Sequence, residues 1–231
     1  MKKMNKNAVA NRVQKMLFLR AMVEHDIENY HVKLMKGNSK TGKDCYTVSL
    51  IPIADCQNCS ACATECYDIR NCCLYPQVQE SRAINSAIHR KDIDRYWREI
   101  SDQVQKLKVK ELRINVGGDL NFDDFLFVRH IAKENPACHF LFFTKNYDDL
   151  NRFLDSWSFP ENVSYIWSRW KGLENNNYHR VPEAHVLYEN GDTTAPEYGA
   201  YYCTGNCSKC HMKGQGCWAL KNGEHVVFRN H

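Results

Sequence analysis

In this sequence of 231 residues, the side chains most suited to bind a metal or a cluster are the cysteines of two short runs. Their residues and gaps are Cys56-x2-Cys59-x2-Cys62-x3-Cys66 and Cys203-x3-Cys207-x2-Cys210-x6-Cys217. Disulfides usually join distant segments of small exported domains, whereas the ligands of one inorganic centre cluster locally. Eight of the twelve cysteines lie in these two runs, which indicates that the runs bind a metal or an iron–sulfur cluster.

The first run has the spacing of ferredoxin-type ligands to a [4Fe–4S] cluster, except that Tyr67 stands where a proline usually follows the fourth cysteine. Zinc sites usually consist of two cysteine pairs separated by a longer segment. Four thiols within eleven residues fit that pattern poorly, so the first run predicts a cluster rather than zinc.

The second run is also compact, but its spacing is less specific. A second [4Fe–4S] cluster is the favoured interpretation, zinc is the main alternative, and ligands that cross between the runs are a third. His211 follows Cys210 and could replace one thiolate. The cysteines outside the runs, expected to be small buried apolar groups, are Cys45, Cys72, Cys73 and Cys138. Cys72 and Cys73 also lie close enough to the first run to act as ligands.

Composition restricts the remaining functions. Hydrophobic residues make up 43% of the chain and charged residues 25%, as in ordinary globular proteins. The net charge of +4 is too small to indicate nucleic-acid binding by itself. No apolar run has the length of a membrane span, and Met16–Leu19 is too short for the core of a signal peptide. A cytoplasmic protein without a membrane partner is therefore expected.

The elements that must position the cysteines alternate between strand and helix. The expected strands are residues 46–53, 111–116, 139–144, 163–167 and 184–187. The expected helices are a partly frayed one within residues 1–36, a long amphipathic one over 81–107, and shorter ones over 121–135 and 147–157. This alternation predicts an α/β fold with a parallel sheet, and about five strands favour a partial (β/α) barrel.

Three regions are expected along the chain. Residues 1–36 form a helical lead-in, residues 37–198 an α/β partial-barrel domain with the first run, and residues 199–231 a cysteine-rich C-terminal module packed on it.

Polar residues follow three successive predicted strands, where ligands of parallel sheets collect. Asp119, Lys145 and Arg169 are the candidate catalytic residues, with Asp119 as a base and the two cations as stabilisers of an anion. Gly117 and Gly118 precede Asp119 and would let the backbone approach a cofactor closely.

Several motifs in this order resemble the phage "gene product 88" type proteins, small proteins of bacteriophages and prophages. The matching segments are residues 37–42, the first run through Tyr67, Gly118-Asp119, Phe143-Thr144-Lys145, Ser168-Arg169-Trp170, and Cys217-Trp218 through Val227-Phe228 to the terminal His231. The resemblance implies a viral or prophage origin, an iron–sulfur centre and, for a phage protein, the host cell cytoplasm.

The scaffold is more loosely similar to radical S-adenosylmethionine enzymes, which place a cysteine loop after the first barrel strand and a Gly-Gly-Glu-Pro motif after the second. Here Gly117-Gly118-Asp119-Leu120 ends the second expected strand. The cysteine gaps of that superfamily run three then two, whereas those of Cys59, Cys62 and Cys66 run two then three. This similarity implies S-adenosylmethionine as a cofactor.

The leading hypothesis is an enzyme that uses a cluster with an open iron site on a small-molecule substrate. Hydrolysis of small esters or similar acyl substrates and radical S-adenosylmethionine chemistry are its two forms. If all four thiolates of a run bind one cluster, electron transfer to a redox partner is expected instead. A non-enzymatic nucleic-acid-binding module built on the second run is the competing class.

Overall fold

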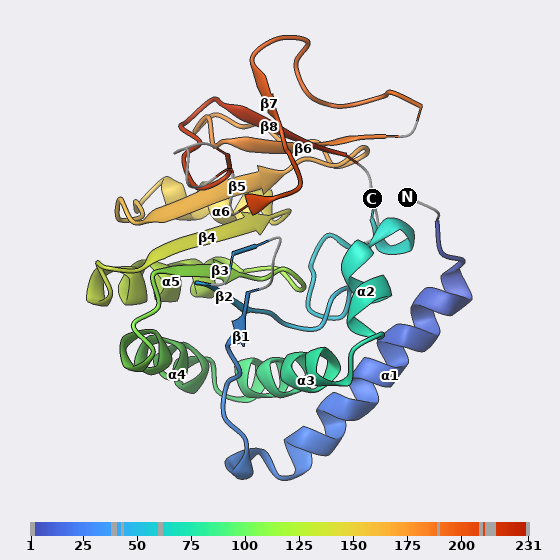
Figure 1. Cartoon of the computed structure of the whole chain (residues 1–231), viewed down its shortest axis with the longest axis vertical. Coiled ribbons are helices and arrows are strands. Elements are labelled where there is room, and N and C mark those ends of the chain that lie inside the picture. The colour runs from blue at the N-terminus through green and yellow to red at the C-terminus, as the bar shows by residue number, and fades with distance from the viewer. Residues whose placement is uncertain are drawn as a thin grey trace.

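The computed structural model describes residues 3–37, 41–42, 44–59, 62–188, 190–207, 210 and 216–229. Its centre is an eight-stranded sheet in the order β1-β2-β3-β4-β5-β6-β8-β7 (Figure 1). The strands are β1 (Met35–Lys36), β2 (Cys45–Val48), β3 (Glu111–Ile114), β4 (His139–Thr144), β5 (Val163–Ser168), β6 (Glu183–Leu187), β7 (Ala200–Tyr202) and β8 (His225–Arg229). Only β1 pairs antiparallel with its neighbour, and every other pairing is parallel. The predicted α/β class with a mainly parallel sheet is confirmed.

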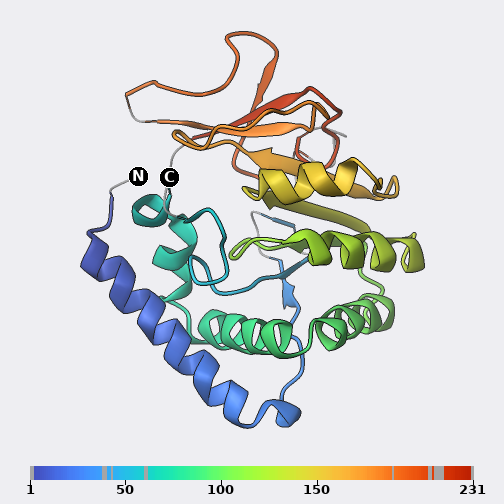
Figure 2. The same ribbon diagram turned by 180° about the vertical axis from the view of Figure 1, so that it is seen from behind.

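Helices cover one face of this sheet. The helices are α1 (Lys6–His25), α2 (Tyr67–Cys72), α3 (Pro76–Lys91), α4 (Ile93–Lys106), α5 (Phe122–Glu134) and α6 (Tyr147–Leu154), with 3-10 turns at Ile27–Asn29 and Ala63–Glu65. Figure 2 shows α5 and α6 in front of the strands and α3 and α4 below them. Leu112 and Ile114 of β3 are buried in the core beneath these helices. Parallel neighbours need crossover connections, which explains the helical layer.

The opposite face of the sheet is covered by the C-terminal segment that contains the second cysteine run. Leu141, Ile166 and Val226 point to this side and pack with Trp218, which follows Cys217. Side chains alternate across a strand, so the residues between them face the helices. β7 and β8 flank the run and belong to the same sheet, and their existence was not predicted from the sequence.

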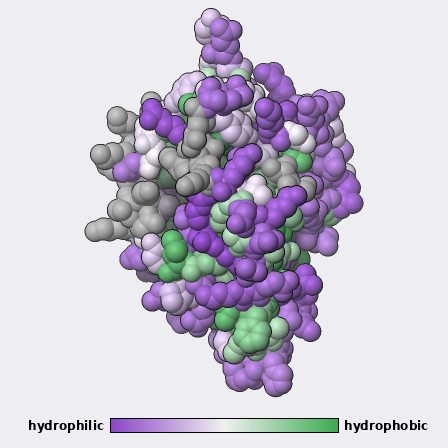
Figure 3. All heavy atoms as spheres, turned by 90° about the vertical axis from the view of Figure 1, so that its right-hand side faces the viewer, coloured by the Kyte–Doolittle hydropathy of each residue, from purple (hydrophilic) through white to green (hydrophobic). Residues whose placement is uncertain are grey.

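Helix α1 lies along the edge of the molecule, against α2 and α3 (Figure 1). Asn5 caps its first turn by accepting a hydrogen bond of 2.7 Å from Ala8 N. The predicted helical character of this segment is confirmed, over 20 residues. The side of the molecule next to α1 is mostly hydrophilic with small apolar patches (Figure 3). Among the described residues, no helix is long and apolar enough to cross a membrane.

Two predicted boundaries were wrong. The single helix expected over residues 81–107 consists of α3 and α4, separated at Asp92, whose carboxylate caps α4 by accepting from Arg95 N at 2.8 Å. The first long strand ends at Val48 instead of residue 53, because the chain then turns. Ile53 in this turn has a φ of 72°, which a strand cannot contain.

Candidate metal and catalytic sites

The first cysteine run lies at the carboxyl ends of the parallel strands, immediately after the turn that follows β2 (Figure 1). Asp55 holds the turn by accepting a hydrogen bond of 2.8 Å from Ile51 N. Within the run, Cys62 N donates to Cys59 O at 3.1 Å, and Cys66 N donates to Ala63 O at 3.4 Å. These hydrogen bonds keep the described part of the run compact.

The thiols of the first run are close enough to interact electrostatically. Burial raises the pKa of Cys56, Cys62 and Cys66, and negative charge on a neighbouring cysteine raises each further. Ile53 N also donates a hydrogen bond of 3.4 Å to Cys56 Sγ. All twelve cysteines are free thiols. The run is thus a local cluster of sulfur donors, and binding to a metal is what deprotonates such thiols.

Asp119 and Lys145 meet beside this run. Asp119 Oδ2 accepts a hydrogen bond of 2.9 Å from Lys145 N, and its Oδ1 accepts one of 2.6 Å from Thr144 Oγ1. Leu120 N donates to the same Oδ1 at 2.8 Å. The carboxylate therefore joins the loop after β3 to the loop after β4, and its orientation is fixed by three donors.

The Lys145 ammonium is next to the thiols. Burial acts to lower the pKa of Lys145, but negative charge at Cys62, Asp119 and Cys56 outweighs it, so the pKa is raised. The ammonium also lies 5.5 Å from the centre of the Trp170 ring. Burial raises the pKa of Asp119, and the hydrogen bond from Thr144 opposes this rise. A cation and a carboxylate thus face the sulfur donors together.

Arg169, the third candidate catalytic residue, makes its contacts elsewhere. Its Nε lies 3.7 Å from Glu183 Oε1, and its guanidinium lies 5.9 Å from the ring centres of Tyr147 and Trp167. The register explains this position, because Trp167 of β5 pairs with Glu183 of β6. The first residue of β6 therefore lies beside the carboxyl end of β5.

Gly117 and Gly118 are required by the packing of the protein itself. A Cβ atom on Gly117 would lie 2.0 Å from Asp68 Oδ2 and 2.1 Å from Arg82 Nη1, a buried ion pair beneath the loop. A Cβ on Gly118 would lie 2.6 Å from Leu50 Cβ, and its φ of 82° favours glycine. Contact of these glycines with a cofactor stays a prediction.

A cavity of about 420 Å³ opens next to the first run. It is lined by Cys56, Asp119, Asp55, His89 and Asn121, among others. Cavities of about 300–1,000 Å³ hold most small-molecule ligands. This one connects a predicted cluster ligand and the predicted base in a single space.

Helix α1 holds the first run against the body of the protein. Arg12 Nη1 donates to Arg70 O at 2.7 Å, and Lys3 Nζ lies 3.0 Å from Glu65 Oε1. Arg20 Nη1 lies 3.3 Å from Asp55 Oδ1. Met16, which is fully buried, packs with Ile51, Ile69 and Cys72. The lead-in is therefore part of the support for this site.

The second run also forms a cluster, on the face of the sheet that the helices leave uncovered. Burial raises the pKa of Cys217, and Cys203, Cys207 and Cys210 all raise it further through their charge. Tyr201 Oη lies 3.0 Å from Cys210 Sγ. The thiols of this run thus interact electrostatically, and the Tyr201 hydroxyl contacts one of them. His211 lies outside the described residues.

Arg113 of β3 provides positive charge to the second run, and sequence reasoning missed it. Its charge lowers the pKa of Cys207 and Cys217, although burial outweighs this effect. Its Nε is buried and has no hydrogen-bond partner in the described part of the chain. A charged residue within the apolar stretch of residues 111–116 was the signal that could have revealed it.

Asn115, directly after β3, is a second residue that sequence reasoning missed. Its φ is 53°, and both polar atoms of its buried side chain lack a hydrogen-bond partner among the described residues. Unsatisfied buried amides are rare and often contact an ion, a water molecule or a ligand. No pattern in the sequence identifies this conformation in advance.

Three of the four cysteines outside the runs are buried as expected, and the prediction was wrong for Cys73. Cys45, Cys72 and Cys138 are buried, and Cys73 is partly exposed. Cys72 Sγ and Cys73 Sγ lie 3.9 Å apart.

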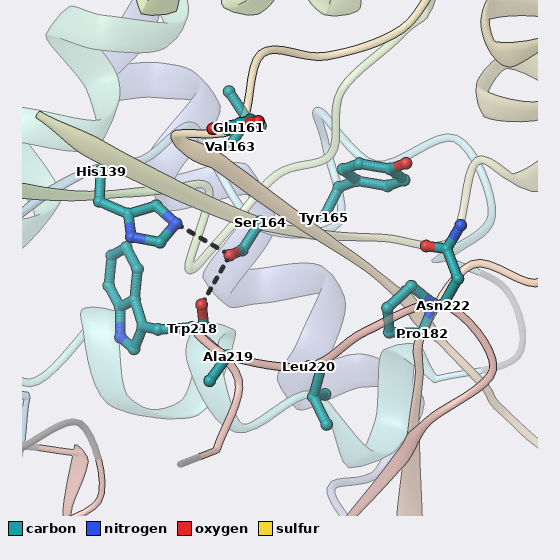
Figure 4. A pocket seen from close by; sticks show the side chains of 10 residues that line it. All are labelled: His139, Glu161, Val163, Ser164, Tyr165, Pro182, Trp218, Ala219, Leu220 and Asn222. Atoms are coloured by element: carbon teal, nitrogen blue, oxygen red, sulfur yellow. Dashed lines mark hydrogen bonds between the residues drawn. The ribbon is translucent and has the colours of Figure 1, made fainter. Parts of the chain in front are cut away.

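A smaller cavity of about 220 Å³ lies at the amino ends of β4 and β5 (Figure 4). His139 Nε2 and Ser164 Oγ lie 3.0 Å apart, and Ser164 donates to Trp218 O at 3.0 Å. None of the candidate site residues lines this cavity. The Ser164 hydroxyl is occupied by the carbonyl of Trp218, which ties the second run to β5.

Comparison with known proteins agrees with the resemblance seen in the motifs. Residues 31–226 match the family model described as Gene product 88, and this match spans both cysteine runs and every strand except the last residues of β8. No curated protein and no solved structure gives a match. The chain therefore belongs to the gene product 88 family.

Proposed function

We propose that this protein is an iron–sulfur enzyme in which the first cysteine run holds a [4Fe–4S] cluster beside a small-molecule site. The observation that carries the proposal is the meeting of Asp119 and Lys145 next to the thiols of that run. A purely structural cluster would not need a lysine, a carboxylate and a cavity of about 420 Å³ in contact with it.

The residues fit such a cluster. The run has ferredoxin-like spacing, its thiols interact with one another, and Lys145 offsets part of the negative charge that thiolate ligands bring. For the second run we propose a second cluster, with zinc as the alternative. Its four thiols and the unsatisfied Nε of Arg113 support either centre, because a bound thiolate would supply an acceptor.

Hydrolysis of a small ester or similar acyl compound is the reaction that these groups support best. If three of the four thiolates of the first run bound the cluster, one iron would keep an open coordination position and would supply a Lewis acid toward a carbonyl oxygen. Lys145 is positioned to stabilise negative charge on the substrate, and Asp119 is positioned to accept a proton from water. Thr144 Oγ1 and Lys145 N hold the Asp119 carboxylate in one orientation for that role.

Radical S-adenosylmethionine chemistry is the second candidate. The loop after β3 is tied to the loop after β2, since Leu50 N donates to Gly117 O and Asp119 N donates to Asp55 O, both at 2.9 Å. This brings the glycine pair next to the first run, where the enzymes of that superfamily bind their cofactor.

Anaerobic purification followed by iron, sulfide and zinc analysis and electron paramagnetic resonance tests the proposal. We expect about eight irons per chain for two cubanes, or about four with one zinc. Colourless protein with zinc as its only metal would contradict it. A spectrum that changes with S-adenosylmethionine and not with an ester favours the second candidate.

Variants then separate catalysis from cluster binding. Asp119→Asn and Lys145→Met should keep the iron content and lose ester hydrolysis by about 100-fold or more. Asp148→Asn is the matched control, because Asp148 is an exposed carboxylate on α6 that accepts a hydrogen bond from Asn175. Unchanged hydrolysis in both site variants would exclude their catalytic role.

A further inference from the structure

Two histidines and a glutamate come together on β6 and β8, apart from both cysteine runs. Glu183 and His185 are two residues apart on β6, so their side chains share a face of the sheet. His225 is the register partner of Glu183 on β8. Ala184 lies between Glu183 and His185, and its register partner Val226 follows His225. Both face the second cysteine run, so the group lies on the opposite side of the sheet.

The three donor atoms are spaced as metal ligands are. His185 Nε2 and His225 Nδ1 lie 3.1 Å apart, and each lies 3.5 Å from Glu183 Oε2. A point equidistant from the three atoms lies about 2.0 Å from each in their common plane, and Zn–N bonds are about 2.0–2.1 Å long. One ion can therefore contact all three without movement of the chain.

Neighbouring residues contact the other polar atoms of two of these ligands. His185 Nδ1 lies 2.9 Å from Thr194 Oγ1, which leaves Nε2 with a free lone pair when the hydroxyl accepts. Asn177 Nδ2 donates to Glu183 Oε1 at 2.9 Å, and Arg169 Nε lies 3.7 Å from the same oxygen. Glu183 Oε2 thus remains available to the two imidazoles. Metal sites typically have this second layer of hydrogen bonds.

The burial of the three side chains differs in a way that suits an accessible ion. The side chain of His185 is 1% exposed, that of Glu183 13%, and that of His225 26%. An ion can therefore enter from the His225 side. Three protein ligands leave a coordination position for water or substrate, as in catalytic zinc sites, whereas structural zinc usually has four.

From this geometry we infer that Glu183, His185 and His225 bind one divalent transition-metal ion, Zn²⁺ or Fe²⁺. Imidazole donors suit these ions, while Ca²⁺ and Mg²⁺ prefer oxygen ligands. The site is independent of the clusters proposed for the cysteine runs. A metal-free hydrogen-bonded pair of histidines is the alternative that an experiment must exclude.

Zinc and iron binding to the full-length chain, purified without oxygen, tests the inference. Zn²⁺ or Fe²⁺ is added, the protein is separated from free metal, and metal content is compared between the wild-type chain and Glu183→Gln and His225→Asn. The wild-type chain should hold one more equivalent of one ion than either variant, since metal bound by cysteines cancels in the difference. His130→Asn is the control, because His130 is an exposed histidine paired with Glu134.

Nitrogen NMR of labelled histidines provides a readout that does not depend on metal counting. Adding Zn²⁺ should shift the Nε2 signal of His185 and the Nδ1 signal of His225, and should leave His130 unchanged. Thr194→Val should weaken binding by about 10- to 100-fold. Equal metal content in the wild-type chain and both variants, or unmoved signals at both histidines with either ion, would overturn the inference. Thermal unfolding of the metal-free variants shows whether they are folded.

Discussion

The hydroxyl of Tyr201 lies 3.0 Å from Sγ of Cys210, while the adjacent Tyr202 points its ring toward solvent. The hydrogen bond to Cys210 raises the pKa of Tyr201 to about 12, so the hydroxyl keeps its proton at neutral pH. A metal-bound thiolate can only accept, and the hydroxyl must then donate.

Tyr201→Phe should therefore weaken the centre that we propose for the second run. The lost hydrogen bond leaves the Cys210 sulfur without its donor, and we expect metal release to a chelator to be about 10-fold faster. Tyr202→Phe removes an exposed hydroxyl from the neighbouring position and should have no effect. Equal release rates in the two variants would mean that Tyr201 does not contact a bound ligand.

Arg113→Met should have opposite effects on the loaded and the metal-free protein. A thiolate centre loses the buried cation that offsets its charge, so metal should be released about 10-fold faster. In the metal-free chain, by contrast, removal of a buried and incompletely satisfied charge is expected to be neutral or stabilising. Chelator kinetics and urea unfolding measure the two effects.

Arg129→Met is the control for this prediction, since the Arg129 guanidinium lies on the partly exposed Trp157 ring at 4.9 Å. If Arg113→Met lowers the unfolding free energy of the metal-free protein as much as that of the loaded protein, then Arg113 has a structural role and does not stabilise the bound metal.

Met16→Ala should weaken the packing of helix α1 against the loop that carries the first run. Met16 is fully buried against Ile51 and Ile69, and truncation of such a side chain costs about 2–5 kcal/mol in the free energy of unfolding. Because the same group of buried apolar side chains supports the cysteine loop, iron bound by the first run should also be lost faster. Phe18→Ala on the same helix is the control, since Phe18 is 65% exposed. Iron retention equal to that of Phe18→Ala would mean that α1 does not support the loop.

The His89–Asp124 pair should make stability depend on pH. Burial acts to lower the pKa of His89, but the hydrogen bond to Asp124 at 2.7 Å outweighs it and the pKa is raised. A raised pKa in the folded state stabilises fully below the unfolded value of about 6.5, and this contribution is lost as the pH rises through the folded pKa.

We therefore expect the difference in unfolding free energy between the wild-type chain and His89→Gln to decrease as the pH rises above about 6.5. Urea unfolding at a series of pH values measures it. His130→Gln, at an exposed histidine, is the control variant. A constant difference for His89→Gln would mean that the pKa of His89 is not raised in the folded protein.

Continuous local patterns made most of the fold predictable. The strands over residues 111–116, 139–144 and 163–167 are apolar runs, and each was found within two residues of its expected ends. The helix expected after Asn121 begins with a capping box formed by Asn121 and Asp124. Both signals depend only on neighbouring residues.

The errors arose where distant parts of the chain determine structure. β7 has three residues and little pattern of its own, and it exists because β8 pairs with it. The break at Asp92 was visible only as an eight-residue gap between Ile88 and Tyr96 in the apolar spacing. Spacing alone does not distinguish a gap from a helix end.

The candidate site was predictable where it depends on the ends of single strands and not where it depends on strand register. The rule that parallel strands present ligand residues at their carboxyl ends correctly brought Asp119 and Lys145 together. Arg169 follows the same rule, but the register of β5 and β6 puts it next to Glu183. Registers depend on long-range pairing, which is also why the Glu183, His185 and His225 group was not expected.

The position of β8 between β6 and β7 has a consequence for biosynthesis. β7 leaves the ribosome before the strand that it must pair with, so the sheet can be completed at this edge only after residues 225–229 have been made. The first cysteine run, by contrast, is followed by more than 150 residues still to be translated. If the proposed centres form, the first run can therefore be loaded before the second, whose surrounding sheet is completed last.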